Sequence, residues 1–106
     1  SPTTASRAAG LALTKVLATE LAPDGIRVNA ICVGIVESGQ WDRMAREQGV
    51  ALEAVHASLV EQPGVPLGRI GRADEFADLG LFLLSARSAY ITGTAVNLDG
   101  GTSPVV

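Results

Sequence analysis

The chain has 106 residues, 47% of them hydrophobic, with a net charge of −3 and a single cysteine. It is long enough for one domain or for part of one. Its mild negative charge provides no basic surface for nucleic acid, and no apolar stretch is long enough to cross a bilayer. Cys32 cannot form an intramolecular disulfide, and His56 is the one histidine, so the sequence predicts no zinc site. No secretory signal is visible, so we expect a cytoplasmic protein. The charge, the apolar stretches and the scarcity of cysteine and histidine lead us to expect no nucleic-acid, membrane or metal partner.

The first predicted element is a helix that runs from about Thr3 to Leu21. Pro2 and the two threonines after it supply a helix start, and Pro23 ends the pattern. Apolar residues recur between these limits at helical spacing, and the first half carries one charge, Arg7, among many alanines. A helix that is apolar on most sides is usually covered by another element, so we expect this one to be buried or to meet another helix.

The second predicted element is a strand from Ile26 to Val33, bounded by Gly25 and Gly34. A short apolar run rich in β-branched residues is typical of a strand buried on both faces of a parallel sheet. Gly34 allows the backbone to turn sharply, or to approach a ligand, just beyond the carboxyl end of the strand. Ligands bind at that edge of open α/β sheets. The alternative is a core strand followed by an ordinary loop, and the strand alone does not decide between them.

Three further helices and a second strand follow. The apolar spacing predicts helices over residues 40–48, 51–61 and 72–85, a loop over 62–68 and a strand over 94–98. The predicted buried face of the helix over 72–85 consists of Phe76, Leu79, Gly80, Leu83 and Leu84. Helix, strand, helical segment, helix and strand in this order predict an α/β fold with two parallel strands and a right-handed crossover. The crossover is longer than one helix requires. We therefore expect residues 39–66 to form an insertion over the end of the first strand, such as a lid or substrate loop.

Several short motifs then stand in a recognisable order. They are Leu17-Ala18-Thr19-Glu20-Leu21-Ala22-Pro23-Asp24-Gly25-Ile26-Arg27-Val28-Asn29-Ala30, Pro66-Leu67-Gly68-Arg69-Ile70-Gly71-Arg72, Tyr90-Ile91-Thr92-Gly93 and Asn97-Leu98-Asp99-Gly100-Gly101. Together they resemble the C-terminal half of a classical short-chain dehydrogenase/reductase, over essentially all 106 residues. The resemblance implies the C-terminal part of a doubly wound Rossmann-type parallel sheet. Residues 1–106 would be one segment of a single domain, and the family's glycine-rich N-terminal half is not in this stretch.

The resemblance also implies an oxidoreductase that uses NAD or NADP on an alcohol/carbonyl pair. In this family the loop after the first strand touches the nicotinamide and usually begins with Pro-Gly and ends with a threonine; here it reads Val33-Gly34-Ile35-Val36-Glu37-Ser38. Val33 lacks the ring that stiffens the turn, Ser38 keeps a hydroxyl in the threonine position, and the backbone of Ile35 would meet the carboxamide. The implied cofactor-binding residues are therefore Arg7, Val33, Gly34, Ile35 and Ser38.

The family's catalytic pair, Tyr-x-x-x-Lys, corresponds to Thr3 and Arg7. Residues four apart share a helix face, so both side chains can act on one site. A threonine hydroxyl donates a hydrogen bond but ionises far less readily than a phenol. Arg7 keeps the positive charge, but its planar fork does not copy an ammonium group. Lys15 and Tyr90 are not obvious replacements.

Three readings of the function remain open on this sequence. The chain is a portion of an oxidoreductase that is inactive alone, or a non-catalytic relative that serves oligomerisation or ligand binding, or part of an enzyme that uses Thr3 and Arg7 differently. The expected partners are a small alcohol or carbonyl substrate, and either a second copy of the chain or the missing N-terminal half.

Overall fold

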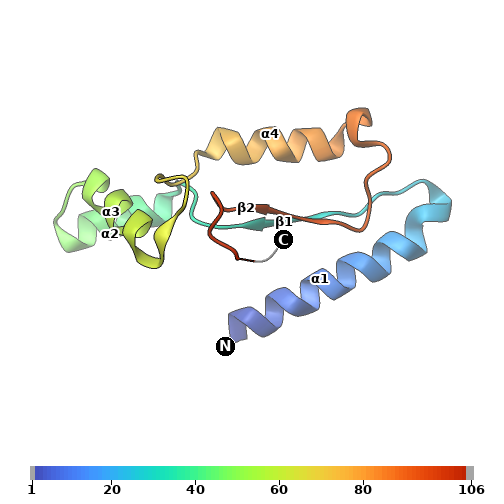
Figure 1. Cartoon of the computed structure of the whole chain (residues 1–106), viewed down its shortest axis with the longest axis horizontal. Helices are drawn as coiled ribbons and strands as arrows, with labels where there is room; N and C mark the ends of the chain where they lie inside the picture. Colours follow the sequence, from blue (N-terminus) through green and yellow to red (C-terminus); the bar gives the residue numbers. More distant parts are fainter. Residues whose placement is uncertain (1, 105–106) are drawn as a thin grey trace. The chain divides into compact units, whose positions relative to one another are not determined.

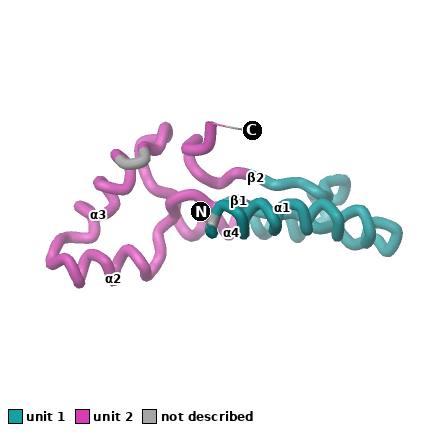
Figure 2. Tube along the Cα trace, turned by 90° about the horizontal axis from the view of Figure 1, so that it is seen from below, with its two compact units in different colours: residues 1–32, 80–96 teal, residues 33–79, 97–106 magenta. Residues whose placement is uncertain are grey.

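The computed structural model describes residues 2–104, without the side chains of Thr3, Gln62 and Pro63. The chain forms two compact units, and each combines two segments that are distant in sequence (Figure 2). The first unit contains residues 1–32 and 80–96, and the second contains residues 33–79 and 97–106.

The first unit opens with helix α1, Pro2–Leu21, as the sequence predicts (Figure 1). The helix continues into a 3₁₀ turn, η1, over Ala22–Asp24, and Gly25 follows in the left-handed conformation with φ of 73°. Ala18 is buried, and a Cβ on Gly93 would lie 3.3 Å from the Ala18 Cβ, so this side of α1 packs against the turn before the second strand. Leu13 and Val16 are 56% and 52% exposed, so the expected burial is found on one side of the helix only.

Two short strands run parallel to one another. Strand β1 covers Ala30–Val33 and strand β2 covers Ala95–Leu98. The Ala30 amide donates to the Thr94 carbonyl at 2.9 Å, and the Gly34 amide donates to the Leu98 carbonyl at 2.9 Å. Both chains advance together between these two bonds, which is the pattern of a parallel pair. The structure thus confirms the α/β fold with a parallel sheet.

Strand β1 begins four residues later than the sequence predicts. The Val28 amide donates to the Thr92 hydroxyl at 3.0 Å, and the Val28 carbonyl accepts from the Gly93 amide at 2.8 Å. The Asn29 side chain bonds the Thr94 amide and hydroxyl. Residues 26–29 are therefore held by a turn and by side chains, because Gly93, with φ of 72°, bends the opposing chain away from a regular ladder.

Helix α4, Ala73–Leu84, ends beside a 3₁₀ turn, η3, over Ala86–Ser88. Of the predicted buried face, Leu83 is buried and Leu79 and Gly80 are half-buried. Phe76 and Leu84, also expected to be buried, are 40% and 84% exposed. The prediction was wrong for these two, because a two-stranded sheet covers only a narrow strip of a helix.

Two helices of the second unit lie in the segment that the sequence predicts to be an insertion. Helix α2 covers Gly39–Gln48 and helix α3 covers Leu52–Leu59, close to the predicted limits, and Ala45 and Val55 are their buried residues (Figure 1). The predicted loop from residue 62 begins later, because α3 continues into a π-helical turn, η2, over Val60–Gly64. The Val65 amide donates to the Val60 carbonyl at 2.9 Å, the five-residue spacing of a π turn.

Candidate functional site

The loop that leaves β1 passes very close to the end of β2. A Cβ on Gly34 would lie 2.6 Å from the Cβ of Asp99 and 2.8 Å from its Cα. No side chain fits there, so Gly34 is required by the close approach of two backbones. The Asp99 carboxylate accepts from the amides of Gly101 and Ser103, both at 2.9 Å, which holds this neighbour in place.

The loop then pairs with the segment before α4 through a parallel bridge between Val36 and Gly71. The Gly71 amide donates to the Ile35 carbonyl and the Glu37 amide donates to the Gly71 carbonyl, both at 2.9 Å. In such a bridge the main-chain groups of the central residue point away from the partner strand. The amide and carbonyl of Val36 therefore face the opposite side, and its carbonyl accepts from Trp41 Nε1 at 2.8 Å.

This pairing occupies the main-chain carbonyl of Ile35, the residue whose backbone the family resemblance expects to meet the nicotinamide carboxamide. The carbonyl of Ile35 already accepts from Gly71, whereas Val36 presents its main chain on the open side. The sequence reasoning did not single out Val36. The alternation of main-chain directions in an extended segment is the signal that could have found it, once Gly71 was recognised as its partner.

A cavity of about 370 Å³ borders Val36 within the second unit. Its lining residues come from the loop, from the start of α2 and from the start of α4: Val33, Gly34, Val36, Glu37, Ser38, Gln40, Trp41, Ala73 and Phe76. Ser38 is the residue before α2, and its side chain makes no capping hydrogen bond. The structure thus brings together Val33, Gly34 and Ser38. Ile35 lines a second cavity of about 100 Å³ near Leu98 and Asp99, which Val36 also lines.

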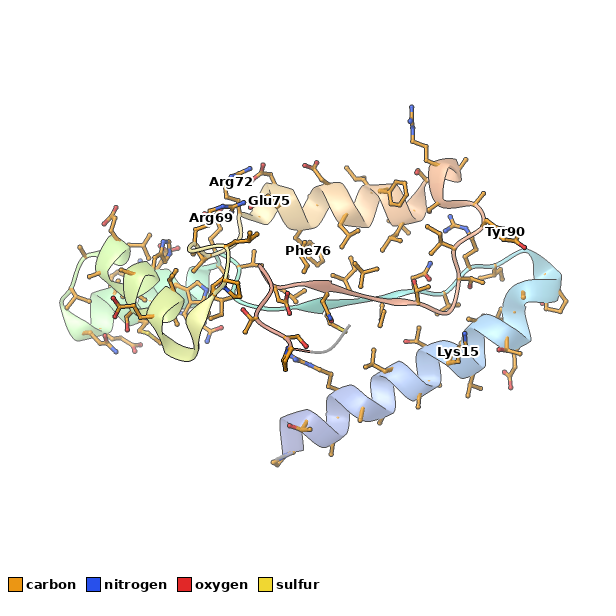
Figure 3. All side chains as sticks on the ribbon, in the orientation of Figure 1. Lys15, Arg69, Arg72, Glu75, Phe76 and Tyr90 are labelled. Atoms are coloured by element: carbon orange, nitrogen blue, oxygen red, sulfur yellow. The ribbon has the colours of Figure 1, made fainter. Side chains whose placement is uncertain are left out.

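Charged side chains gather where the loop meets the first turn of α4 (Figure 3). Arg69 donates to both carboxylate oxygens of Glu75, at 2.7 and 2.8 Å, and the Arg72 amide donates to the same carboxylate at 2.9 Å. The hydrogen bonds from Arg69 and then from Arg72 lower the pKa of Glu75 to about 2. The same ion pair raises the pKa of Arg69. This arrangement fixes the segment that pairs with Val36.

The predicted proton-transfer pair lies in the first unit. Thr3 falls in the first turn of α1 and its side chain is outside the described residues, and Arg7 is exposed one turn later. Lys15 lies against the turn at Gly93, where its Nζ is 3.1 Å from the position of an added Cβ, and Tyr90 is fully exposed (Figure 3). Neither has a position in the cavity beside Val36.

Over residues 2–104, no group of three or more His, Cys, Asp or Glu side chains could hold a metal ion. Over the same residues, no helix combines the length and the apolar character that crossing a bilayer requires. Cys32, in β1, and His56, in α3, are both half-buried.

A parallel strand pair, a glycine turn at the carboxyl end of one strand and helices between the strands are features of doubly wound α/β proteins. Comparison with known proteins gives the family. The family model described as Enoyl-(Acyl carrier protein) reductase matches residues 1–103. The chain belongs to the short-chain dehydrogenase/reductase family, as its sequence motifs indicate.

Individual relatives are similar over nearly the whole chain. Short-chain dehydrogenase virB of Hypocrea virens is 42% identical over 100 residues, which cover 94% of this chain and 38% of that protein. A short-chain oxidoreductase of Pseudomonas aeruginosa, described as containing an atypical catalytic center, is 41% identical; its apo structure matches 98% of this chain and 41% of its own with a TM-score of 0.88. The NADPH-bound structure of that protein matches with a TM-score of 0.87, covering 98% and 39%. The chain thus spans about 40% of the length of these relatives.

Proposed function

We propose that this chain carries the nicotinamide side of an NAD(P)-dependent oxidoreductase that interconverts an alcohol and a carbonyl compound. The main observation behind the proposal is the loop after β1, where Gly34 packs against Asp99 and Val36, whose main chain points away from Gly71, lines an open cavity. Ligands of doubly wound folds bind at the carboxyl ends of the strands, where this loop lies. The NADPH-bound structure of the Pseudomonas relative supports the same cofactor class.

The residues around the loop fit the nicotinamide end of such a cofactor. The Val36 amide is a main-chain donor on the cavity side, suited to a carboxamide oxygen. Ser38 adds a hydroxyl that does not cap α2, and Gly34 leaves room beside the backbone. Val33 lines the same cavity, and we assign Arg7 to the ribose because its guanidinium keeps a positive charge. The bound cofactor would supply or accept the hydride.

Proton transfer then falls to residues that differ from the family's usual pair. Thr3 can donate a hydrogen bond to a substrate oxygen, but its alkoxide is inaccessible near neutral pH. General acid–base catalysis by a well-placed group is typically worth about 10²–10⁴-fold in rate, and most of that would be missing. The Pseudomonas relative, which is described as having an atypical catalytic center and is seen with NADPH, supports cofactor use with such a departure. The helical insertion over residues 39–66 would contact the small substrate.

The test is NADPH or NADH oxidation by a protein in which this chain is preceded by the family's glycine-rich half. Thr3→Tyr combined with Arg7→Lys should raise kcat on a simple carbonyl substrate by at least about 10-fold. Thr3→Tyr alone should give less, because its phenol lacks the ammonium that lowers its pKa. Cofactor binding is measured separately in each variant. A parent unaffected by Thr3→Val would show that the proton comes from another group.

A second candidate is a non-catalytic relative that keeps the fold for ligand binding or assembly. The replacement of both members of the usual pair, at Thr3 and Arg7, favours it. This reading predicts saturable NADPH binding with no turnover in the parent, and no turnover when tyrosine and lysine are restored. Turnover in the restored variant would exclude it.

A further inference from the structure

The first turn of α4 lacks a local N-cap. Arg72, the residue before the helix, has only donors on its side chain, whereas N-cap positions favour Ser, Thr, Asp or Asn, which accept from the first amides. Glu75 supplies half of a capping box, because its carboxylate accepts from the Arg72 amide at 2.9 Å. The Glu75 amide already donates to the Arg72 carbonyl at 3.0 Å, whereas the Ala73 amide, at the first position of the helix, has no acceptor within its own helix.

That acceptor comes from the loop after β1. Glu37 Oε1 accepts from the Ala73 amide at 3.1 Å, across 36 residues of sequence. A carboxylate at a helix N-terminus is also favoured by the helix dipole. The same residue donates its own amide to the Gly71 carbonyl at 2.9 Å, so Glu37 is tied to the segment before α4 by its main chain and to α4 by its side chain.

The two hydrogen bonds of Glu37 hold the loop over residues 33–38 against the segment before α4. The bridge to Gly71 sets a register in which the amide and carbonyl of Val36 point away from Gly71. In the motif that the loop resembles, a proline stiffens the turn, and Val33 stands in its place here. We propose that Glu37 is a positioning residue, which caps α4 and thereby holds the Val33–Ser38 loop in the register that presents Val36. Its effect on a cofactor rests on the proposed function; the capping itself does not.

The capping is tested on this chain by hydrogen exchange at the Ala73 amide. Glu37→Ala should speed that exchange by about fivefold, the worth of an ordinary hydrogen bond. Glu37→Gln keeps an acceptor oxygen of the same reach and should restore most of the protection. The matched control is Glu47→Ala, which removes an exposed glutamate of α2 and should leave Ala73 unchanged. Equal exchange in the parent and in Glu37→Ala would overturn the proposal.

Trp41 provides a second measurement, because it is the single tryptophan of the chain and its indole donates to the Val36 carbonyl. A looser loop should expose the Trp41 indole, so acrylamide should quench its fluorescence more strongly in Glu37→Ala than in the parent. Quenching in Glu37→Gln should equal that of the parent. If Glu37→Ala does not fold, Glu37→Asp replaces it, since a carboxylate one methylene shorter should not reach Ala73. Unaltered quenching in the folded variant would count against the positioning role.

The consequence for the cofactor is measured in the protein that includes the glycine-rich half. Glu37→Ala should raise the Kd for NADPH by about fivefold, with the KM for the carbonyl substrate unchanged and with rescue by Glu37→Gln. An unchanged Kd would overturn the positioning role. If no variant binds NADPH, including the parent, while Ala73 exchange responds as expected, the proposed function fails and the capping stands.

Discussion

Gly34 lies where the chain leaving β1 passes closest to the end of β2. In Gly34→Ala the new Cβ would meet Asp99 at 2.6 Å from its Cβ and 2.8 Å from its Cα, closer than any real Cβ contact. Neither neighbour is the flexible end of a side chain, so one backbone must move. We expect Gly34→Ala to lower the free energy of unfolding by about 1–3 kcal/mol, the usual cost of overpacking. Denaturant unfolding followed by circular dichroism measures it.

Gly10 is the control for that substitution. It lies in α1, and a Cβ there would have nothing within 4 Å. Gly10→Ala should raise the free energy of unfolding by about 1 kcal/mol, because alanine favours a helix interior over glycine. A Gly34→Ala variant as stable as the parent would show that the two backbones can separate without cost.

At the scale of an element, the C-terminal end of α4 is held by one arginine from a distant segment. Arg27 Nη1 donates to the Leu83 carbonyl at 2.9 Å and to Ser88 Oγ at 3.0 Å, and Nη2 donates to the Ser85 carbonyl at 3.1 Å. The positive charge also suits a helix C-terminus. Ser88 is 1% exposed, so removal of the Arg27 side chain would deprive the Ser88 hydroxyl of a hydrogen-bond donor in a place that water does not reach.

We therefore expect Arg27→Ala to lower the free energy of unfolding by about 2 kcal/mol, since it removes charged hydrogen bonds to carbonyls that are partly shielded from water. Arg87→Ala is the matched control. Arg87 is exposed in the neighbouring turn, and its loss should change stability by less than about 0.5 kcal/mol. Thermal or denaturant unfolding measures the free energy of unfolding of both variants. Equal losses in Arg27→Ala and Arg87→Ala would show that the hydrogen bonds of Arg27 add no stability of their own.

The other end of α4 should respond to acid. The pKa of Glu75 is about 2 in the folded chain, below the ordinary 4.5, because Arg69 and the Arg72 amide bond the carboxylate. A depressed folded pKa contributes stability that is fully present above about pH 4.5 and is lost as the pH falls toward 2. Glu75→Gln should therefore lose less stability than the parent between these values. Salt should weaken the difference, because the pair is exposed.

Nuclear magnetic resonance titration of the Glu75 carboxyl provides the direct check on this ion pair. Its pKa should rise toward the ordinary value in Arg69→Ala, with Arg43→Ala, on α2, as the control. A Glu75 carboxyl that titrates normally in the parent would mean that the bidentate geometry does not persist in solution.

Across the whole molecule, the sequence predicted what depends on local pattern. Helical spacing and Pro23 placed α1, and the apolar run before Gly34 placed β1, although not its start. That start depends on Thr92 and Gly93, more than sixty residues away, and no local pattern contains such a bond. For the same reason the sequence did not predict the contacts of Val36 with Gly71 and of Glu37 with Ala73, which join residues more than thirty positions apart.

The exposed fraction of a side chain is the other property that the local sequence pattern did not predict. Leu13 and Val16 have the spacing of a buried stripe, yet both are about half exposed, while Ala18 is buried. Periodicity shows which residues share a face but not whether this chain covers that face. The exposed pair is what the family resemblance leads us to expect of a helix that packs across an interface between copies.

We therefore predict that Leu13→Asp disrupts self-association. Leu13 and Val16 lie three residues apart on one side of α1 and are surrounded by alanines that allow close approach of another helix. A buried carboxylate without a partner is costly at such an interface. Thr19→Asp is the control, because Thr19 is exposed and its hydroxyl bonds only the Lys15 carbonyl of its own helix. Sedimentation should show Leu13→Asp dissociating at concentrations where the parent and Thr19→Asp remain associated. If both variants assemble like the parent, the exposed leucine faces solvent and the assembly uses another surface.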